Sequence, residues 1–351
     1  MTLPRATLGP GYEISRVIRG GWQLAGGHGA IDQAEAVEDL VATAQAGITT
    51  FDCADIYTGV EEIIGAFRRT YASRFGAEAL GQIRVHTKCV PDLDKLARLT
   101  RPMLRETVAR SAQRLGVERL DLVQFHWWDY AQGDWLEAAS WLREFQDEGL
   151  IHLLSGTNFG TDQVAAMFGA GIRLATLQTQ YSLLDLRPEK RMAALAAREG
   201  MQFLCYGTVA GGFLSDRWLG RPDPKGEMEN RSLTKYHLII EDFGGWDLFQ
   251  SLLGCLRTVA DRHRSDIATV ASAVMLTRPQ VAGVIVGARN RAHLAANLRI
   301  GTLALLPEDL AAIEAVLAQS VPLKGDVYEL ERDRHGRHGA IMKYNLNKEE
   351  A

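Results

Sequence analysis

Short apolar runs alternate with longer amphipathic stretches along nearly the whole chain, and this alternation constrains the fold more than any other feature. The runs are dense in Val, Ile, Leu and Phe with little strict alternation, which is typical of parallel strands buried on both faces. Eight strands are predicted, over residues 16–20, 49–52, 83–88, 120–126, 151–157, 175–181, 201–206 and 281–286. Eight strand–helix units are what a closed (β/α)8 barrel, the TIM barrel, requires.

The stretches between these runs carry helix patterns. Residues 32–46 place apolar side chains on one face, and Gly47 ends the pattern. Further helices are expected over 103–115, 134–148, 161–168 and 188–198. The rhythm breaks between residues 207 and 280, where a polar, glycine-rich segment precedes two helices at 246–262 and 266–277. So long an insertion after the seventh strand predicts a functional loop, such as a cofactor lid.

Length and composition agree with one catalytic barrel. The 351 residues could hold two domains, but barrels of this size often form one, and no Pro- or Ser-rich linker divides the chain. We therefore expect a single domain over residues 1–351. The net charge is −4 with both signs mixed along the chain, so nucleic acid is not an expected partner. The four cysteines are too widely spaced for a zinc site or a disulfide framework.

Two features that the sequence lacks bear on the expected cellular location of the protein. The N-terminus lacks the apolar core of a signal peptide. The chain also lacks a run of ~20 apolar residues, so no membrane-spanning helix is expected. The expected location is the cytoplasm.

Polar and ionisable residues gather where the predicted strands end, which is where barrel enzymes carry their active sites. Four of them form a coherent set: Asp52, Tyr57, Lys88 and His126. Carbonyl reduction needs a proton donor, and a nearby ammonium group would favour ionisation of a tyrosine. An aspartate would hold the lysine, and a histidine could hydrogen-bond the carbonyl oxygen. Taken singly, each could be structural: a buried ion pair, a satisfied histidine, or a tyrosine capping the barrel.

The runs FDCADIY, TKC, LVQFHWW, SGTNF and LQTQYS follow one another in an order that resembles the aldo-keto reductase superfamily, from about residue 16 to residue 297. The resemblance implies an NADP(H)-dependent enzyme that interconverts a carbonyl (aldehyde, ketone or sugar) and an alcohol. It implies Tyr57 as the proton donor, Lys88 and Asp52 as its modulators, and His126 as the group that orients the substrate.

The same resemblance implies a cofactor site. Thr157, Asn158 and Gln178 would hold the nicotinamide carboxamide, and Tyr206 would stack on the ring. The pyrophosphate would lie against three glycines: Gly207, Gly211 and Gly212. GARNRAHLAAN, which begins at Gly287, resembles the adenosine-phosphate signature, with Arg289 and His293 at a 2′-phosphate and Asn297 at adenine. Ala296 stands where the family usually has an acidic residue, and His293 where it usually has a basic one. The resemblance therefore implies a preference for NADP(H), and these two departures leave NAD(H) possible.

Three tryptophans and the C-terminus complete the expected site. Trp22, Trp127 and Trp128 could line an apolar substrate pocket, or pack inside the protein. The charged tail, residues 325–351, could close over the substrate or stay solvated. No metal site is expected, because no His-x-His accompanies the acidic pair Asp52 and Asp55.

Two other functions are consistent with a barrel of this kind. The first is a regulatory protein that binds the cofactor without turnover, like the β subunits of potassium channels. The second is another barrel enzyme, such as a hydrolase, which the TNF and QxxY strand ends disfavour.

Overall fold

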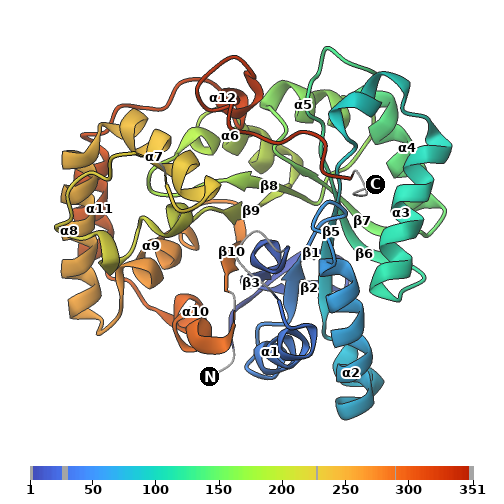
Figure 1. Ribbon diagram of the computed structural model, residues 1–351, viewed down its shortest axis with the longest axis horizontal. Helices are drawn as coiled ribbons and strands as arrows, with labels where there is room; N and C mark the ends of the chain where they lie inside the picture. The colour runs from blue at the N-terminus through green and yellow to red at the C-terminus, as the bar shows by residue number, and fades with distance from the viewer. Residues whose placement is uncertain (1–2, 26–30, 227, 289, 348–351) are drawn as a thin grey trace.

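The eight predicted strands form a closed parallel barrel in the order β10-β3-β4-β5-β6-β7-β8-β9 (Figure 1). The computed structural model describes residues 3–25, 31–226, 228–288 and 290–347. The barrel strands are β3 (Val17–Gly20), β4 (Thr50–Asp52), β5 (Arg84–Cys89), β6 (Leu120–Phe125), β7 (Ile151–Thr157), β8 (Thr176–Gln180), β9 (Gln202–Tyr206) and β10 (Val281–Gly287). Each predicted boundary lies within about one residue of the observed one, so the predicted (β/α)8 fold is confirmed.

Helices surround the barrel and cover its outer face, except the last and shortest, which lies over the end of the barrel where the strands finish (Figure 1). They are α1 (Gln33–Gln45), α2 (Val60–Leu80), α3 (Arg101–Leu115), α4 (Trp135–Asp147), α5 (Thr161–Gly169), α6 (Arg191–Glu199), α7 (Arg231–Phe243), α8 (Trp246–Arg262), α9 (Ile267–Met275), α10 (Leu294–Thr302), α11 (Pro307–Leu317) and α12 (Glu329–Arg332). The main core lies between the two layers, where Phe51 of β4 packs on Phe67 of α2 with ring centroids 4.8 Å apart.

Local signals explain where several helices start and stop. The Asp32 carboxylate accepts hydrogen bonds from the backbone N–H groups of Ala34 and Glu35 at the start of α1. Gly116 ends α3 in the left-handed conformation. The sequence analysis did not predict α2, α7, α10, α11 or α12. In α2, alternating charges and a kink at Gly76 obscure the apolar stripe.

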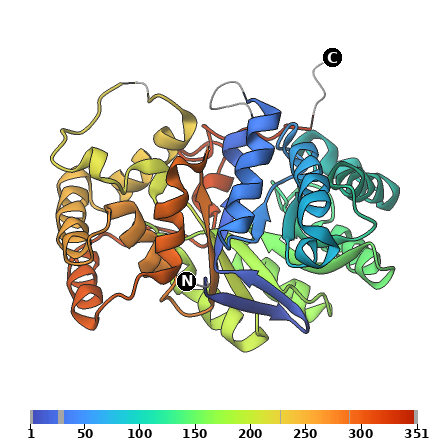
Figure 2. The same ribbon diagram turned by 90° about the horizontal axis from the view of Figure 1, so that it is seen from below.

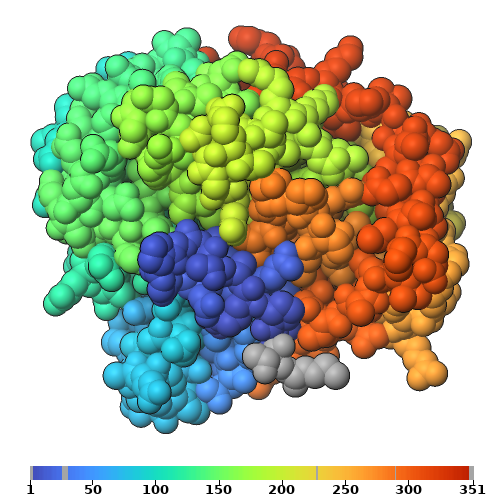
Figure 3. Space-filling model, turned by 180° about the vertical axis from the view of Figure 1, so that it is seen from behind, coloured from blue at the N-terminus to red at the C-terminus, as the bar shows by residue number. Residues whose placement is uncertain are grey.

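A β-hairpin, also not predicted, covers the end of the barrel where the strands begin. It consists of β1 (Arg5–Gly9) and β2 (Tyr12–Ser15), which pair antiparallel. Tyr12 and Ile14 form a buried cluster with Ile18, Leu204 and Ala282. Figure 3 shows the hairpin, in dark blue, over the middle of that face, and Figure 2 shows it on the side away from the C-terminus. Solvent therefore reaches the barrel interior less easily from this end.

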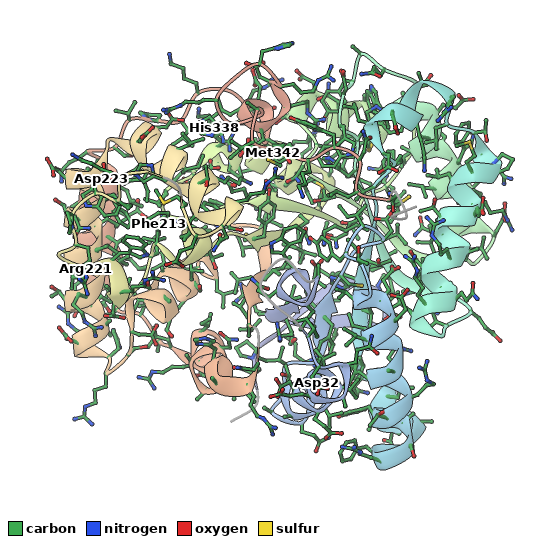
Figure 4. The ribbon with its side chains drawn as sticks, in the orientation of Figure 1. Asp32, Phe213, Arg221, Asp223, His338 and Met342 are labelled. Atoms are coloured by element: carbon green, nitrogen blue, oxygen red, sulfur yellow. The ribbon has the colours of Figure 1, made fainter. Side chains whose placement is uncertain are left out.

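The C-terminal segment (residues 325–347) crosses the opposite end, where the strands finish (Figure 1). Arg332 donates hydrogen bonds to the carbonyls of Trp127, Trp128 and Asn158, in the loops after β6 and β7. Farther along, the Tyr344 carbonyl accepts from the Leu93 N–H after β5. His338 and Met342, labelled in Figure 4, also lie on this segment. The segment thus ties several strand-end loops together across the barrel mouth.

The described residues give two further findings. No helix among them is both long and apolar enough to cross a membrane. Within the same residues, no group of three or more His, Cys, Asp and Glu side chains is arranged to hold a metal ion.

Candidate active site

Lys88 and Asp52 form a buried ion pair at the ends of two neighbouring strands. Lys88 Nζ lies 2.6 Å from Asp52 Oδ2 and donates a second hydrogen bond to the Cys53 carbonyl at 2.8 Å. Both side chains are nearly inaccessible to solvent. Burial alone would lower the pKa of Lys88, but the charge of Asp52 outweighs it, and the pKa lies above its usual range. Lys88 is therefore a fixed cation.

Two amides hold the other oxygen of this carboxylate. Gln124 Nε2 and Gln178 Nε2 each donate to Asp52 Oδ1 at 2.7 Å. Gln124 was not singled out from the sequence, although it lies two residues before His126 in the run QFHWW. Gln178 was expected to hold a nicotinamide carboxamide, but here its amide nitrogen is engaged with Asp52. Asp52 is thus fixed by one ammonium and two amide groups.

Tyr57 lies in the turn before α2, with its ring beside the ammonium of Lys88. The Nζ atom lies 4.9 Å from the centroid of the Tyr57 ring, and Trp22 packs edge-on against the same ring at 5.1 Å. Burial raises the pKa of the Tyr57 phenol, and the opposing attraction of Lys88 does not cancel it. The sequence argument gave the direction of the Lys88 effect but not the larger effect of burial. At neutral pH the Tyr57 hydroxyl therefore carries its proton.

His126 is neutral and presents an unprotonated nitrogen to the site. Its Nδ1 lies 3.0 Å from the Thr157 carbonyl oxygen, which can only accept a hydrogen bond, so Nδ1 carries the proton. Burial, and then the charge of Arg332, lower the pKa of His126 to about 3. Nε2 is buried and has no hydrogen-bond partner among the described residues. The expected hydrogen bond from His126 to a carbonyl oxygen needs a donor, and in this tautomer Nε2 is an acceptor.

The three tryptophans occupy different environments. Trp22 is 43% exposed beside Tyr57. Trp127 is completely buried, and its indole N–H donates to the carbonyls of Asp129 and Gln132, so it packs inside the protein, as one of the two alternatives from the sequence expected. Trp128 is 8% exposed, and its ring stands perpendicular to His126 with centroids 4.3 Å apart.

Tyr206 and Asn158 meet at the ends of β9 and β7. The Tyr206 hydroxyl donates to Asn158 Oδ1 at 2.9 Å, and the Tyr206 ring is partly exposed. Asn158 has a φ of 61°, the left-handed conformation that asparagine tolerates better than most residues. Thr157 is buried, and its carbonyl is bound to His126. A partly exposed aromatic face next to a side-chain amide suits a flat ring that carries a carboxamide.

The predicted glycines differ in what surrounds them. A Cβ at Gly207 would lie 2.1 Å from the Tyr236 hydroxyl, and one at Gly211 would lie 2.8 Å from the same side chain. These two glycines are therefore required by packing against α7. Gly287 is similarly crowded by the Gln23 side chain at 2.1 Å. Gly212, with a φ of +105°, has no atom within 4 Å of the position that a Cβ would take, and it leaves room for a ligand.

The predicted adenosine side is only partly described. Arg289 lies outside the described residues. His293, at the end of a short 3-10 helix (Arg291–His293), is exposed, and Asn297 of α10 is buried. Arg291 was not considered from the sequence. Its side chain is 62% exposed and its Nε lies 3.1 Å from Asp39 Oδ1, so it adds a cation beside this loop.

The C-terminal segment brings Tyr328 into the site, which the sequence analysis missed. The Tyr328 ring stands perpendicular to His126 at 5.8 Å, and its backbone is left-handed with a φ of 58°. Lys235 of α7 lies 5.2 Å from the Tyr206 ring centroid and 5.6 Å from that of Tyr328. The charged run DVYELERDR pointed to the segment as a whole. It carried no periodicity that would select the inward-facing residues.

A buried ion network anchors this segment. Arg187, after β8, binds Asp185 at 2.7 Å and Glu331 of α12 at 3.0 Å, and all three side chains are inaccessible. Burial opposes ionisation of Glu331, but Arg187 and Lys235 outweigh it and lower its pKa to about 2. α12 is therefore fixed to the barrel by a charge-paired contact.

The site lies at the C-terminal end of the barrel strands, where a protonated tyrosine stands beside a Lys–Asp ion pair. This arrangement defines a (β/α)8-barrel protein that is equipped for proton transfer. The chain belongs to the aldo/keto reductase family, whose model matches residues 16–318. This family uses nicotinamide cofactors.

Individual relatives are distant. The chain is 28% identical over 254 residues to flagellar radial spoke protein 5 of Chlamydomonas reinhardtii. This match covers 62% of this chain and 47% of the spoke protein. It thus spans about half the length of this relative. It is 24% identical to the NADH-specific methylglyoxal reductase of Escherichia coli, over 86% of this chain and 96% of the reductase. The structure of a glycerol dehydrogenase from Gluconobacter oxydans superposes with a TM-score of 0.75 at 23% identity, over 93% of this chain and 97% of that one.

Proposed function

We propose that the protein is an oxidoreductase that interconverts a small carbonyl compound (an aldehyde, ketone or sugar) and its alcohol, with NADP(H) as cofactor and Tyr57 as proton donor. The observation that carries the proposal is the Lys88–Asp52 ion pair beside the protonated Tyr57, at the C-terminal end of the barrel. Family membership supports the same reaction class.

Each side chain has a defined part in this reaction. A bound nicotinamide would supply or accept the hydride. Tyr57 gives its proton to the oxygen that becomes the alcohol, and Lys88 stabilises the phenolate left behind. Asp52, held by Gln124 and Gln178, keeps Lys88 charged and in place. A fixed ammonium lowers the cost of forming the phenolate without moving during the reaction.

The residues proposed to bind the cofactor are those whose side chains and free space suit the parts of NADP(H). Tyr206 and Asn158 would contact the nicotinamide, and the free space at Gly212 would admit the pyrophosphate. Arg291 and His293 lie on the loop that we propose to bind a 2′-phosphate, and the exposed Arg291 cation supports a preference for NADP(H). One relative is named as an NADH-specific reductase, so the cofactor titration compares NADPH with NADH.

We also propose that the C-terminal segment closes the substrate site and excludes water. Arg332 binds three backbone carbonyls of the strand-end loops, and Tyr328 stands against His126. Excluding water strengthens the electrostatic interactions on which the proton transfer depends.

A titration with NADPH and NADH, followed by a turnover screen of aldehydes, ketones and sugars, tests the proposal. We expect micromolar binding of NADPH, weaker binding of NADH, and reduction of at least one carbonyl class. If neither cofactor binds below millimolar concentration, the proposal is wrong. Tight binding without turnover of any carbonyl or alcohol would instead favour the regulatory, cofactor-binding alternative.

A further inference from the structure

A second buried aspartate joins the turn that carries Tyr57, between β4 and α2, to the end of β5. Asp55 is 5% exposed, and both of its carboxyl oxygens accept backbone N–H groups: Oδ1 from Ile56 at 2.9 Å and Oδ2 from Val90 at 3.0 Å. The Asp55 N–H donates to the Lys88 carbonyl at 3.4 Å. The side chain therefore connects the residue before Tyr57 with the residue two positions after Lys88.

The other hydrogen bonds of this turn fix its shape more than its place. The Tyr57 N–H donates to the Ala54 carbonyl at 3.1 Å, and the Tyr57 carbonyl accepts from the Val60 N–H at 3.0 Å. Both of these bonds stay within the turn and the start of α2, so neither ties Tyr57 to β5. Of the two ties that Asp55 makes to β5, the one from its carboxyl group, at 3.0 Å, is shorter than the one from its backbone, at 3.4 Å.

The groups around Asp55 determine the pH at which it can hold both N–H groups. Burial raises the pKa of its carboxyl group to about 8, and Glu61 of α2 adds to this rise, whereas the two N–H groups and Arg110 of α3 oppose it. Arg114, also on α3, donates to the Asp55 carbonyl at 3.3 Å. A carboxylate offers two equal acceptors, whereas a protonated carboxyl group keeps one good acceptor. Asp55 therefore holds both N–H groups most firmly above about pH 8, where the Tyr57 phenol is still protonated.

We propose that Asp55 is a positioning residue for the proton transfer: its carboxylate fixes the turn that carries Tyr57 against the strand end that carries Lys88. The inference rests on the proposed function, because Asp55 acts only through Tyr57. The hydrogen bonds of its carboxylate go to backbone groups, so it takes no part in the chemistry itself. Displacing a reacting group by about 1 Å can cost up to ~10²-fold in rate, so a tie of this kind bears directly on turnover.

Two variants of Asp55 and one matched control test the proposal. Asp55→Asn keeps the size of the side chain, but its amide oxygen can accept from one N–H only, and its NH2 group then faces the other. Asp55→Ala removes both acceptors without setting a donor against either N–H, and it replaces Asp55→Asn should that variant not fold. The control is Asp121→Asn: Asp121, in β6, accepts from the Val85 N–H at 2.8 Å, near the opposite end of β5.

Single-turnover hydride transfer is measured for wild type and each variant, alone and combined with Tyr57→Phe, with folding checked by circular dichroism. The pH is about 9, above the pKa of Asp55. We expect Asp55→Asn to lower the rate about ten- to hundredfold, with the cofactor Kd changed less than about twofold, and Asp121→Asn to keep the wild-type rate. In the Tyr57→Phe background, Asp55→Asn should change the rate by less than about twofold, because the hydroxyl that it positions is gone.

A folded Asp55 variant with the wild-type rate would overturn the positioning role and leave the proposed function standing. Equal fold losses in the presence and in the absence of the Tyr57 hydroxyl would do the same, because Asp55 would then not act through Tyr57. If Tyr57→Phe alone keeps the wild-type rate, or if the wild-type protein turns over no carbonyl or alcohol, the proposed function and the positioning role both fail.

Discussion

Replacing Lys88 with methionine tests whether the Lys88–Asp52 pair is as tightly coupled as its geometry indicates. Methionine keeps most of the length and packing of the lysine side chain but removes its charge. Asp52 then remains buried, with the two amide hydrogen bonds from Gln124 and Gln178 and no countercharge. Leaving one partner of a buried pair typically costs about 3–5 kcal/mol. Because the two amides still stabilise the carboxylate, we expect a loss near the lower end, about 3 kcal/mol.

Urea unfolding followed by circular dichroism at neutral pH gives the free energy of unfolding for wild type, Lys88→Met, Asp52→Asn and the double variant. The double variant removes the unpaired charge, so it should be more stable than the sum of the two single losses predicts, by about 1–3 kcal/mol. A Lys88→Met protein within about 1 kcal/mol of wild type, or strictly additive losses, would refute the coupling.

Three further outcomes follow from the structure. Glu331→Gln should loosen the C-terminal segment, and its free energy of unfolding should depend less on pH in the acid range than that of wild type. The pKa of Glu331 is about 2 in the folded protein and lies below its unfolded value, so its stabilisation is present above about pH 4.5 and is lost as the pH falls toward 2. Matching urea midpoints for both proteins from pH 6 to pH 3 would contradict this. The pH profile of kcat/KM should show no inflection near pH 6.5 from His126, whose pKa is about 3, and an inflection there that vanishes in His126→Phe would count against the neutral ring. Arg291→Ala should raise the Kd for NADPH about tenfold with little change for NADH, as measured by fluorescence titration, and equal changes for both cofactors would remove Arg291 from the 2′-phosphate site.

The barrel could be predicted because its signal is local. Each strand is a short, largely apolar run that is buried on both faces. The set Asp52, Tyr57, Lys88 and His126 could also be predicted, because parallel strands bring their carboxyl ends to one edge. The β1–β2 hairpin was missed because its strands are only five and four residues long and lie outside the repeating strand–helix units.

The state of the site residues needed three-dimensional information. Lys88 lowers the pKa of Tyr57, as expected, but burial raises it by more. The extent of that burial depends on packing by Trp22 and α2. The tautomer of His126 depends on a carbonyl from the next strand, and Trp127 and Trp128 differ although they are adjacent. Tyr328 contacts His126 although it lies more than 200 residues after it in the sequence, because the segment that carries it is held to the barrel by Glu331.

Single-turnover hydride transfer in Tyr57→Phe tests the central claim most directly. Phenylalanine keeps the ring against Trp22 and removes only the hydroxyl that supplies the proton. With folding checked by circular dichroism and the cofactor bound, we expect the rate to fall about 10²–10⁴-fold, while cofactor affinity barely changes. A folded, cofactor-loaded variant that reduces a good carbonyl substrate at the wild-type rate would show that Tyr57 is not the proton donor.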